Sequence, residues 1–118
     1  RIVHPITVGI QALQAKGIEI ITLTGTRHTM QTELIAQYFE RSNITVLRPE
    51  ADDIKQIDKI RLEVFESGYS EVIKAKMLGI FNRYLNVVIA CTELSILNNE
   101  NDYYDLARMQ IAKVIARV

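Results

Sequence analysis

The only cysteine of the chain stands where a buried strand is expected to end. The apolar run Val87–Ala90 leads into Cys91, and Thr92 and Glu93 follow at once. Ligand sites of parallel sheets lie at the carboxyl ends of strands. A thiol that begins a following helix also lies near unpaired N–H groups, which favour the thiolate. The pattern predicts an acid–base or nucleophilic thiol beside a carboxylate, and a small buried apolar cysteine is the alternative.

A second polar segment also follows an expected strand. Gly25 permits a tight turn, and the helix expected after it offers unpaired N–H groups to an anion. Thr26 and Thr29 add hydroxyls, and His28 lies in the same loop. Two interpretations stand: an anion-binding loop, in which His28 lines the site, or an ordinary strand-to-helix turn with a solvated histidine. Neither histidine of the chain has metal-ligand spacing, so we expect no metal site.

Composition limits the remaining functions. The chain of 118 residues fits one domain, and its 14 basic and 14 acidic side chains give no net charge and no basic tract. We therefore expect no nucleic-acid partner. The apolar runs are too short for a membrane span. A single cysteine excludes an internal disulfide and fits the reducing cytoplasm, where we expect the protein. The chain begins at Arg1 inside an apparent element, which suggests a fragment or a processed product.

Apolar patterning predicts strands and helices in alternation. Strands are expected at 18–24, 44–47 and 87–90, with a further short strand at Tyr103–Tyr104. Helices are expected at 4–16, from Thr29 to about 39, from Asp52 or Asp53 to Gly68, from Ser70 to about 84, at 93–97 and at 105–117. This order predicts an α/β fold: a single three-layer domain with a short parallel sheet of three to four strands flanked by helices on both faces.

Details of these elements are also predicted. Thr29 is the expected cap of the second helix, and Asp52 or Asp53 caps the third. The faces expected to point inward carry, among others, Leu34, Ile35, Tyr38, Phe39, Phe65, Leu106, Met109, Val114 and Ile115. The polar run 98–102 is expected to be a solvated loop.

Several segments resemble one enzyme family. Leu23–Met30 (LTGTRHTM) is similar to the LLGTRxTM segment of aspartate racemases, and Val88–Leu94 (VIACTEL) to their VILGCTE segment. Asp105–Arg108 resembles the start of their closing DxxRxH segment, and residues 48–68 resemble their PxxxD stretch and the helix after it. The chain thus resembles the aspartate/glutamate racemase superfamily over nearly its whole length. It would be about the second, C-terminal half of such a protein, without the N-terminal domain.

The resemblance implies a cofactor-independent amino-acid racemase acting on aspartate or glutamate. Two similar domains would face each other, and one thiol from each would move a proton on opposite faces of the substrate α-carbon. Cys91 would be the second-domain thiol, and Glu93 would tune its proton transfer. The substrate would be an amino acid or another dicarboxylate. The residues expected to hold it are Gly25, Thr26, Arg27, His28 and Thr92.

The resemblance also implies partners for the chain. One thiol cannot perform a two-thiol inversion, so the fragment alone is expected to be inactive without its missing N-terminal domain. A homodimer in which each chain supplies one thiol is the alternative arrangement. No pyridoxal phosphate and no other cofactor is expected.

Three positions depart from the family pattern. Ala90 replaces the usual glycine before the cysteine, and Gln110 replaces the closing histidine. Glu71 lies where family members often carry a basic residue, and it would repel a dicarboxylate. Two other functions therefore stay open. One is a catalytically degenerate domain that binds a small anion or a partner. The other is a related cysteine enzyme of the hydantoin racemase or malonate decarboxylase type.

Overall fold

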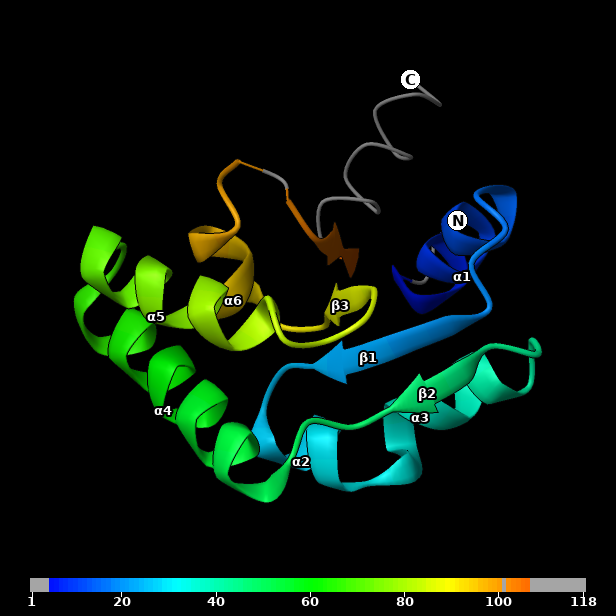
Figure 1. Ribbon diagram of the computed structural model, residues 1–118, viewed down its shortest axis with the longest axis horizontal. Helices are drawn as coiled ribbons and strands as arrows, with labels where there is room; N and C mark the ends of the chain where they lie inside the picture. Colours follow the sequence, from blue (N-terminus) through cyan, green and yellow to red (C-terminus); the bar gives the residue numbers. More distant parts are fainter. Residues whose placement is uncertain (1–4, 101, 107–118) are drawn as a thin grey trace.

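The computed structural model describes residues 5–100 and 102–106, which alternate helices and strands (Figure 1). The helices are α1 (Pro5–Ala15), α2 (Arg27–Gln31), α3 (Glu33–Glu40), α4 (Ala51–Ser67), α5 (Glu71–Phe81) and α6 (Thr92–Leu97). The strands are β1 (Ile20–Thr24), β2 (Thr45–Leu47), β3 (Val87–Ile89) and β4 (Tyr104–Asp105). Each predicted strand is confirmed, including the short fourth one. Of the helix predicted at 105–117, all but its first two residues lie outside the described part of the chain.

The four strands form one parallel sheet in the order β2-β1-β3-β4. From β1 the chain first crosses to β2 on one side and later returns to β3 on the other side. Such a reversal of strand order opens a crevice at the carboxyl ends of the two strands beside it, here β1 and β3. The predicted α/β class is confirmed, and the topology marks one end of β1 and β3 as the place for a ligand.

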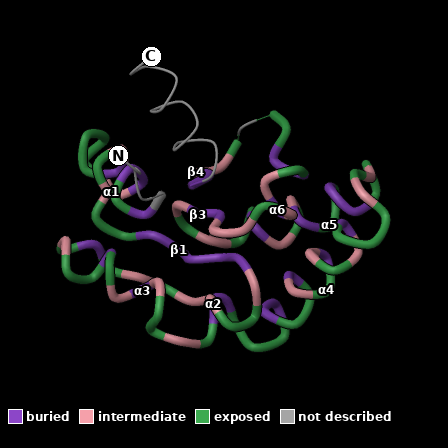
Figure 2. The backbone as a smooth tube through the Cα atoms, turned by 180° about the vertical axis from the view of Figure 1, so that it is seen from behind, coloured by how far each residue is buried: buried purple, intermediate pink, exposed green. Residues whose placement is uncertain are grey.

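Two apolar cores cover the two faces of the sheet. Figure 1 shows α4, α5 and α6 gathered on one side and α1 and α3 on the other, and Figure 2 shows that β1 and β3 are largely buried between them. The first core includes Met30, Ile54, Ile57, Ile60, Val64, Ile73, Met77, Phe81, Val87, Ile89, Leu94 and Leu97. The second includes Ile6, Leu13, Ile21, Leu23, Ala36, Phe39, Ile44, Val88 and Leu106. The three-layer arrangement follows from this division.

Helix α4 ends and α5 begins at residues whose chemistry suits those positions. Gly68 follows α4 with a φ of 77°, a left-handed conformation that glycine adopts without steric cost. Ser70 precedes α5, and its side chain accepts a hydrogen bond from the Ile73 N–H at 3.3 Å. Both predicted signals are confirmed, and together they set the sharp reversal between two helices that pack side by side.

Two other predicted caps are wrong. The cap of α2 is Thr26, whose hydroxyl accepts from the Thr29 N–H, and a second cap, Thr32, begins α3. The sequence segment predicted as one helix is therefore two. Glu50 precedes α4 without a side-chain cap, so neither acidic residue of the first turn caps it. Asp53 instead turns inward, where it bonds to Arg83 and Tyr84.

Three side chains predicted to face the core are exposed. Leu34 and Tyr38 on α3 are 54% and 41% exposed, and Phe65 on α4 is 74% exposed. Helix α3 buries Ala36 and Phe39, and an angle of about 100° per residue places Leu34 far round the helix from both. Phe65 comes one residue after buried Val64 and turns away from the core for the same reason. The apolar side of each of these two helices is wider than the part of it that other elements cover.

The run at 98–102 was predicted to be a solvated loop, but Asn98 is buried at its start. The Asn98 amide accepts hydrogen bonds from the N–H groups of Asp102 and Tyr103 at 3.0 and 3.3 Å. It also donates to the Tyr103 carbonyl at 3.2 Å. Because a buried amide needs such partners, this side chain holds the loop that brings β4 beside β3. No helix in the described part of the chain has the length and apolarity needed to cross a membrane.

Candidate functional site

The two polar segments singled out in the sequence meet at the carboxyl ends of β1 and β3. Thr24 and Ile89 are paired in the sheet, and the Ala90 N–H donates to the Thr24 carbonyl at 2.9 Å. A Cβ atom on Gly25 would lie 3.6 Å from the Ala90 carbonyl carbon. Segments more than sixty residues apart therefore touch beside Cys91, as expected from a parallel sheet.

Gly25 itself does not have the role that the sequence suggested. Its φ is not positive, unlike those of Gly17 and Gly68. A Cβ atom there would meet Thr29 at 3.4 Å, which is ordinary contact. The turn after β1 thus needs no glycine, and the tight-turn prediction is wrong on this point.

Cys91 precedes α6 as its N-cap residue and is partly buried against the core between α4, α5 and α6. Burial raises the pKa of the Cys91 thiol to about 12. The Leu94 N–H opposes this shift, the charge of Glu93 adds to it, and the charge of Arg61 lowers the pKa. The prediction of a depressed pKa is therefore wrong, because the loss of solvent outweighs the helix terminus. At neutral pH the thiol is protonated.

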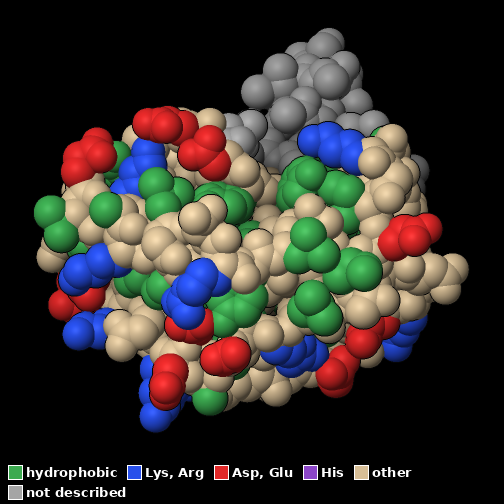
Figure 3. Space-filling view, viewed as in Figure 1, with side chains coloured by type: hydrophobic (Ala, Val, Ile, Leu, Met, Phe, Trp, Pro, Cys, Tyr) green, Lys and Arg blue, Asp and Glu red, His purple; other side chains and the backbone are tan. Residues whose placement is uncertain are grey.

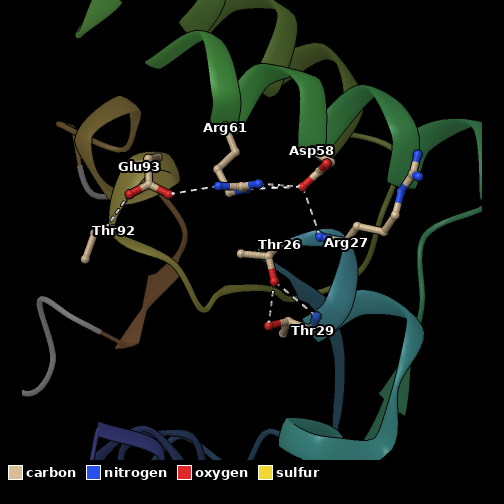
Figure 4. A network of polar contacts seen from close by, with 7 residues as sticks. All are labelled: Thr26, Arg27, Thr29, Asp58, Arg61, Thr92 and Glu93. Atoms are coloured by element: carbon tan, nitrogen blue, oxygen red, sulfur yellow. Dashed lines mark hydrogen bonds and ion pairs between the residues drawn. The ribbon is translucent and has the colours of Figure 1, made fainter. Parts of the chain in front are cut away.

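Glu93 is held from two sides in a network of polar contacts (Figure 4). Its Oε2 accepts a hydrogen bond from the Thr92 hydroxyl at 2.7 Å. Its Oε1 lies 3.6 Å from Nη1 of Arg61 on α4. The side chains of Arg61 and Glu93 are about four-fifths buried, which strengthens the pair relative to an exposed one. The predicted catalytic carboxylate thus has a fixed position two residues after Cys91.

Arg61 joins this carboxylate to the first loop. Its Nε donates to Asp58 Oδ1 at 3.1 Å, and its Nη2 lies at the same distance from that oxygen. Asp58 Oδ1 also accepts the Arg27 N–H at 3.1 Å. Burial lowers the pKa of Arg61, but the hydrogen bond and charge of Asp58, together with the hydrogen bond of Glu93, raise it by more, so the pKa of Arg61 is raised. The guanidinium remains charged and bridges the two loops.

Asp58 and Arg61 are not among the site residues that the sequence predicts. Their spacing of three residues places both on one side of α4, which is a detectable signal. Acid–base pairs at that spacing are common on solvated helix surfaces, however, so the pattern alone does not identify a site. Only the packing of α4 against the two loops gives the pair its place.

The predicted substrate-binding residues of the first loop are partly engaged within the protein. The Thr26 hydroxyl accepts from the Thr29 N–H at 3.2 Å and lies 3.1 Å from the Thr29 hydroxyl. The Arg27 N–H donates to Asp58, so that amide is already occupied by a partner within the protein. The Arg27 and His28 side chains are exposed, and Figure 4 shows the Arg27 side chain directed away from Glu93.

The segment after Gly68 has an internal network of its own. The Tyr69 hydroxyl donates to Glu71 at 2.7 Å. Lys74, which is buried, donates to Asn99 at 2.6 Å and pairs with Glu100 at 3.1 Å. These contacts fasten the start of α5 to the loop after α6. The family's closing position, Gln110, lies outside the described residues.

Charge is mixed on the face shown in Figure 3, where acidic and basic side chains alternate around the rim and apolar side chains gather nearer the middle. This matches the neutral composition of the chain. Across residues 5–100 and 102–106, no cluster of three or more histidine, cysteine or acidic side chains has a geometry that could hold a metal ion.

Comparison with known proteins finds similarity in structure alone. No family model matches the sequence, and no curated protein matches it. A proposed Asp/Glu racemase from Yersinia pestis superposes with a TM-score of 0.77 at 22% identity, covering 91% of this chain and 51% of that one. An aspartate racemase homologue from Pyrococcus horikoshii superposes with a TM-score of 0.80 at 21% identity, covering 97% and 54%.

The chain thus spans about half the length of both solved structures. The similarity covers nearly all of this chain. The resemblance read from the motifs is confirmed at the level of the fold: this chain has the architecture of one half of the Asp/Glu racemase structures.

Proposed function

We propose that this chain is one half of a cofactor-independent amino-acid racemase, with Cys91 as one of two acid–base thiols. The observation that carries the proposal is the contact between the two motif loops, in which the Ala90 N–H binds the Thr24 carbonyl at 2.9 Å. It brings the LTGTRHTM and ACTE segments to the crevice where α/β sheets bind ligands. The fold of the two racemase-type structures supports the same conclusion.

The proposed chemistry is a transfer of two protons. A thiolate on one face of the substrate removes the α-proton and becomes a thiol, while the electrons of the C–H bond move toward the α-carboxylate. A thiol on the opposite face then gives its proton to the α-carbon and becomes a thiolate. Cys91 is protonated at neutral pH, so it is prepared to act as the donor. The chain holds one cysteine, so the second thiol comes from another polypeptide segment or chain.

Glu93 and its partners would control this donor. A carboxylate near a thiol disfavours the thiolate that remains after proton donation, and a nearby guanidinium offsets that effect. The Thr92 hydroxyl and Arg61 hold the carboxylate in place. Substrate would enter beside Thr26, whose hydroxyl would have to share its bonds with Thr29.

A non-catalytic domain that binds a partner or a small anion is the second candidate. Two observations favour it. The Arg27 N–H, one of the amides expected to hold a substrate carboxylate, is occupied by Asp58. Burial also keeps Cys91 far from the thiolate form that a base requires. A domain that had lost the reaction would show both features.

Racemisation assays on the protein as its gene encodes it separate the two candidates. We expect chiral chromatography to detect conversion of L-aspartate or L-glutamate to the D form, and the Cys91→Ala variant to lose it. Thr45→Ala, on the exposed edge strand, is the matched control. Conversion that is unchanged in Cys91→Ala contradicts the thiol mechanism. An absence of conversion for both amino acids, together with a normal circular dichroism spectrum, contradicts an aspartate or glutamate racemase and is what the non-catalytic domain predicts, as does a related cysteine enzyme with another substrate.

A further inference from the structure

Arg61 on α4 lies between the two loops of the candidate site, the loop after β1 and the start of α6. Two of its nitrogens lie 3.1 Å from Asp58 Oδ1, and a third lies 3.6 Å from Glu93 Oε1 (Figure 4). The fork of the guanidinium lets one side chain face two carboxylates at once. Asp58 also binds the Arg27 N–H, so Arg61 is attached to the loop after β1 as well as to α6.

The charges of Glu93 and Arg61 have opposite effects on the ionisation of the Cys91 thiol. Glu93 and Cys91 are two residues apart at the start of α6, and the negative carboxylate disfavours a negative sulfur. A positive charge placed against the carboxylate reduces that repulsion. Both partners of the Arg61–Glu93 pair are mostly buried, so solvent screens the pair less than it would at the surface.

We propose that Arg61 is a positioning residue for Cys91: held by Asp58, its guanidinium fixes the Glu93 carboxylate and shields the thiol from that negative charge. Its importance for turnover rests on the proposed function. Its effect on the thiol does not, because the ionisation of Cys91 is a property of the folded chain.

Alkylation of Cys91 measures this effect without any racemase activity. The chain and its variants are treated with iodoacetamide at pH 9, and the labelled fraction is followed by mass spectrometry. Because the thiolate is the reacting species, the alkylation rate rises with the thiolate fraction, although a more basic thiolate is a better nucleophile and recovers about 0.4 of each logarithmic unit lost. We expect Arg61→Gln to slow the reaction about fourfold and Glu93→Gln to speed it about twofold, as one pKa unit changes the alkylation rate about fourfold once nucleophilicity is counted.

The decisive comparison is a double-mutant cycle. If Arg61 shields the thiol from Glu93, then Glu93→Gln should speed alkylation about twofold in the wild-type chain but about fourfold in the Arg61→Gln chain. Arg61→Lys keeps the charge without the fork, so it should give an intermediate ratio. Equal ratios in all three backgrounds overturn the proposal, because a purely structural role for Arg61 predicts no coupling.

Arg83→Gln is the matched control. It removes the same charge from an arginine that pairs with Asp53, so it should leave the alkylation rate within about twofold of wild type. Unfolding cannot imitate the expected result, since an unfolded chain exposes the thiol and reacts faster, whereas loss of the shield makes it react more slowly. An Arg61→Gln chain that is folded by circular dichroism yet reacts at the wild-type rate contradicts the proposal.

Discussion

The Cys91 thiol should react slowly with alkylating agents for as long as the chain is folded. Burial raises its pKa to about 12, whereas a free cysteine has a pKa of about 8.5. The difference of about 3.5 units leaves the folded chain roughly 3,000-fold less thiolate than free cysteine at neutral pH. A more basic thiolate is also a better nucleophile, which recovers about 1.5 of those 3.5 logarithmic units. The net expectation is alkylation about 100-fold slower than that of free cysteine.

The assay is the rate of iodoacetamide labelling between pH 7 and pH 11. In the folded chain the logarithm of the rate should rise by about one per pH unit, without reaching a plateau below pH 11. In guanidinium chloride the rate should return to that of free cysteine and level off above about pH 9. A folded chain that levels off below pH 9, or that reacts as fast as free cysteine at pH 7, would refute the reasoning from burial.

Three further predictions concern stability, each measured by urea unfolding. Asp53→Asn should lower the free energy of unfolding by about 1–3 kcal/mol at pH 7, because Arg83 and the Tyr84 hydroxyl lose the charged acceptor of their hydrogen bonds. The Tyr84 hydroxyl and Arg83 lower the pKa of Asp53, so this contribution is present above about pH 4 and disappears as the pH falls through the lowered value; a wild-type–variant difference that stays constant to pH 2 contradicts it. Asn98→Ala should cost about 2 kcal/mol and speed amide exchange in the loop before β4, since the N–H groups of Asp102 and Tyr103 lose their acceptor, the buried Asn98 side chain. Ser70→Ala should cost about 1 kcal/mol by removing the α5 cap, and an unchanged unfolding midpoint would count against that role.

Much of the candidate site could be predicted because it depends on strand order and local sequence. The run Val87–Ala90 is β-branched and apolar, so it forms a central strand, and Cys91 at its end is carried to the carboxyl edge of the sheet. The segment from Gly25 to Thr29 reaches the same edge by the same rule. Parallel pairing of β1 with β3 then makes their meeting unavoidable.

The error about the Cys91 pKa shows what local sequence leaves out. The start of a helix favours a thiolate. The Leu94 N–H does have this effect, because its hydrogen bond lowers the pKa of Cys91. Desolvation depends on what packs around the cysteine, and Cys91 packs against a core to which α4, α5 and α6 all contribute. Their packing is a property of the whole domain, so no motif around the cysteine contains it.

By itself the sequence determined the alternation of strands and helices, the parallel sheet and the two loops at its carboxyl edge, because periodicity and turn residues are local. Tertiary structure alone decided that Asp58 accepts a hydrogen bond from the Arg27 N–H, that Arg61 pairs with Glu93, and that Cys91 is partly buried. Those contacts join α4 to loops more than thirty residues away on either side. Their energies depend on distance and burial in the folded domain, and neither quantity is present in a linear sequence.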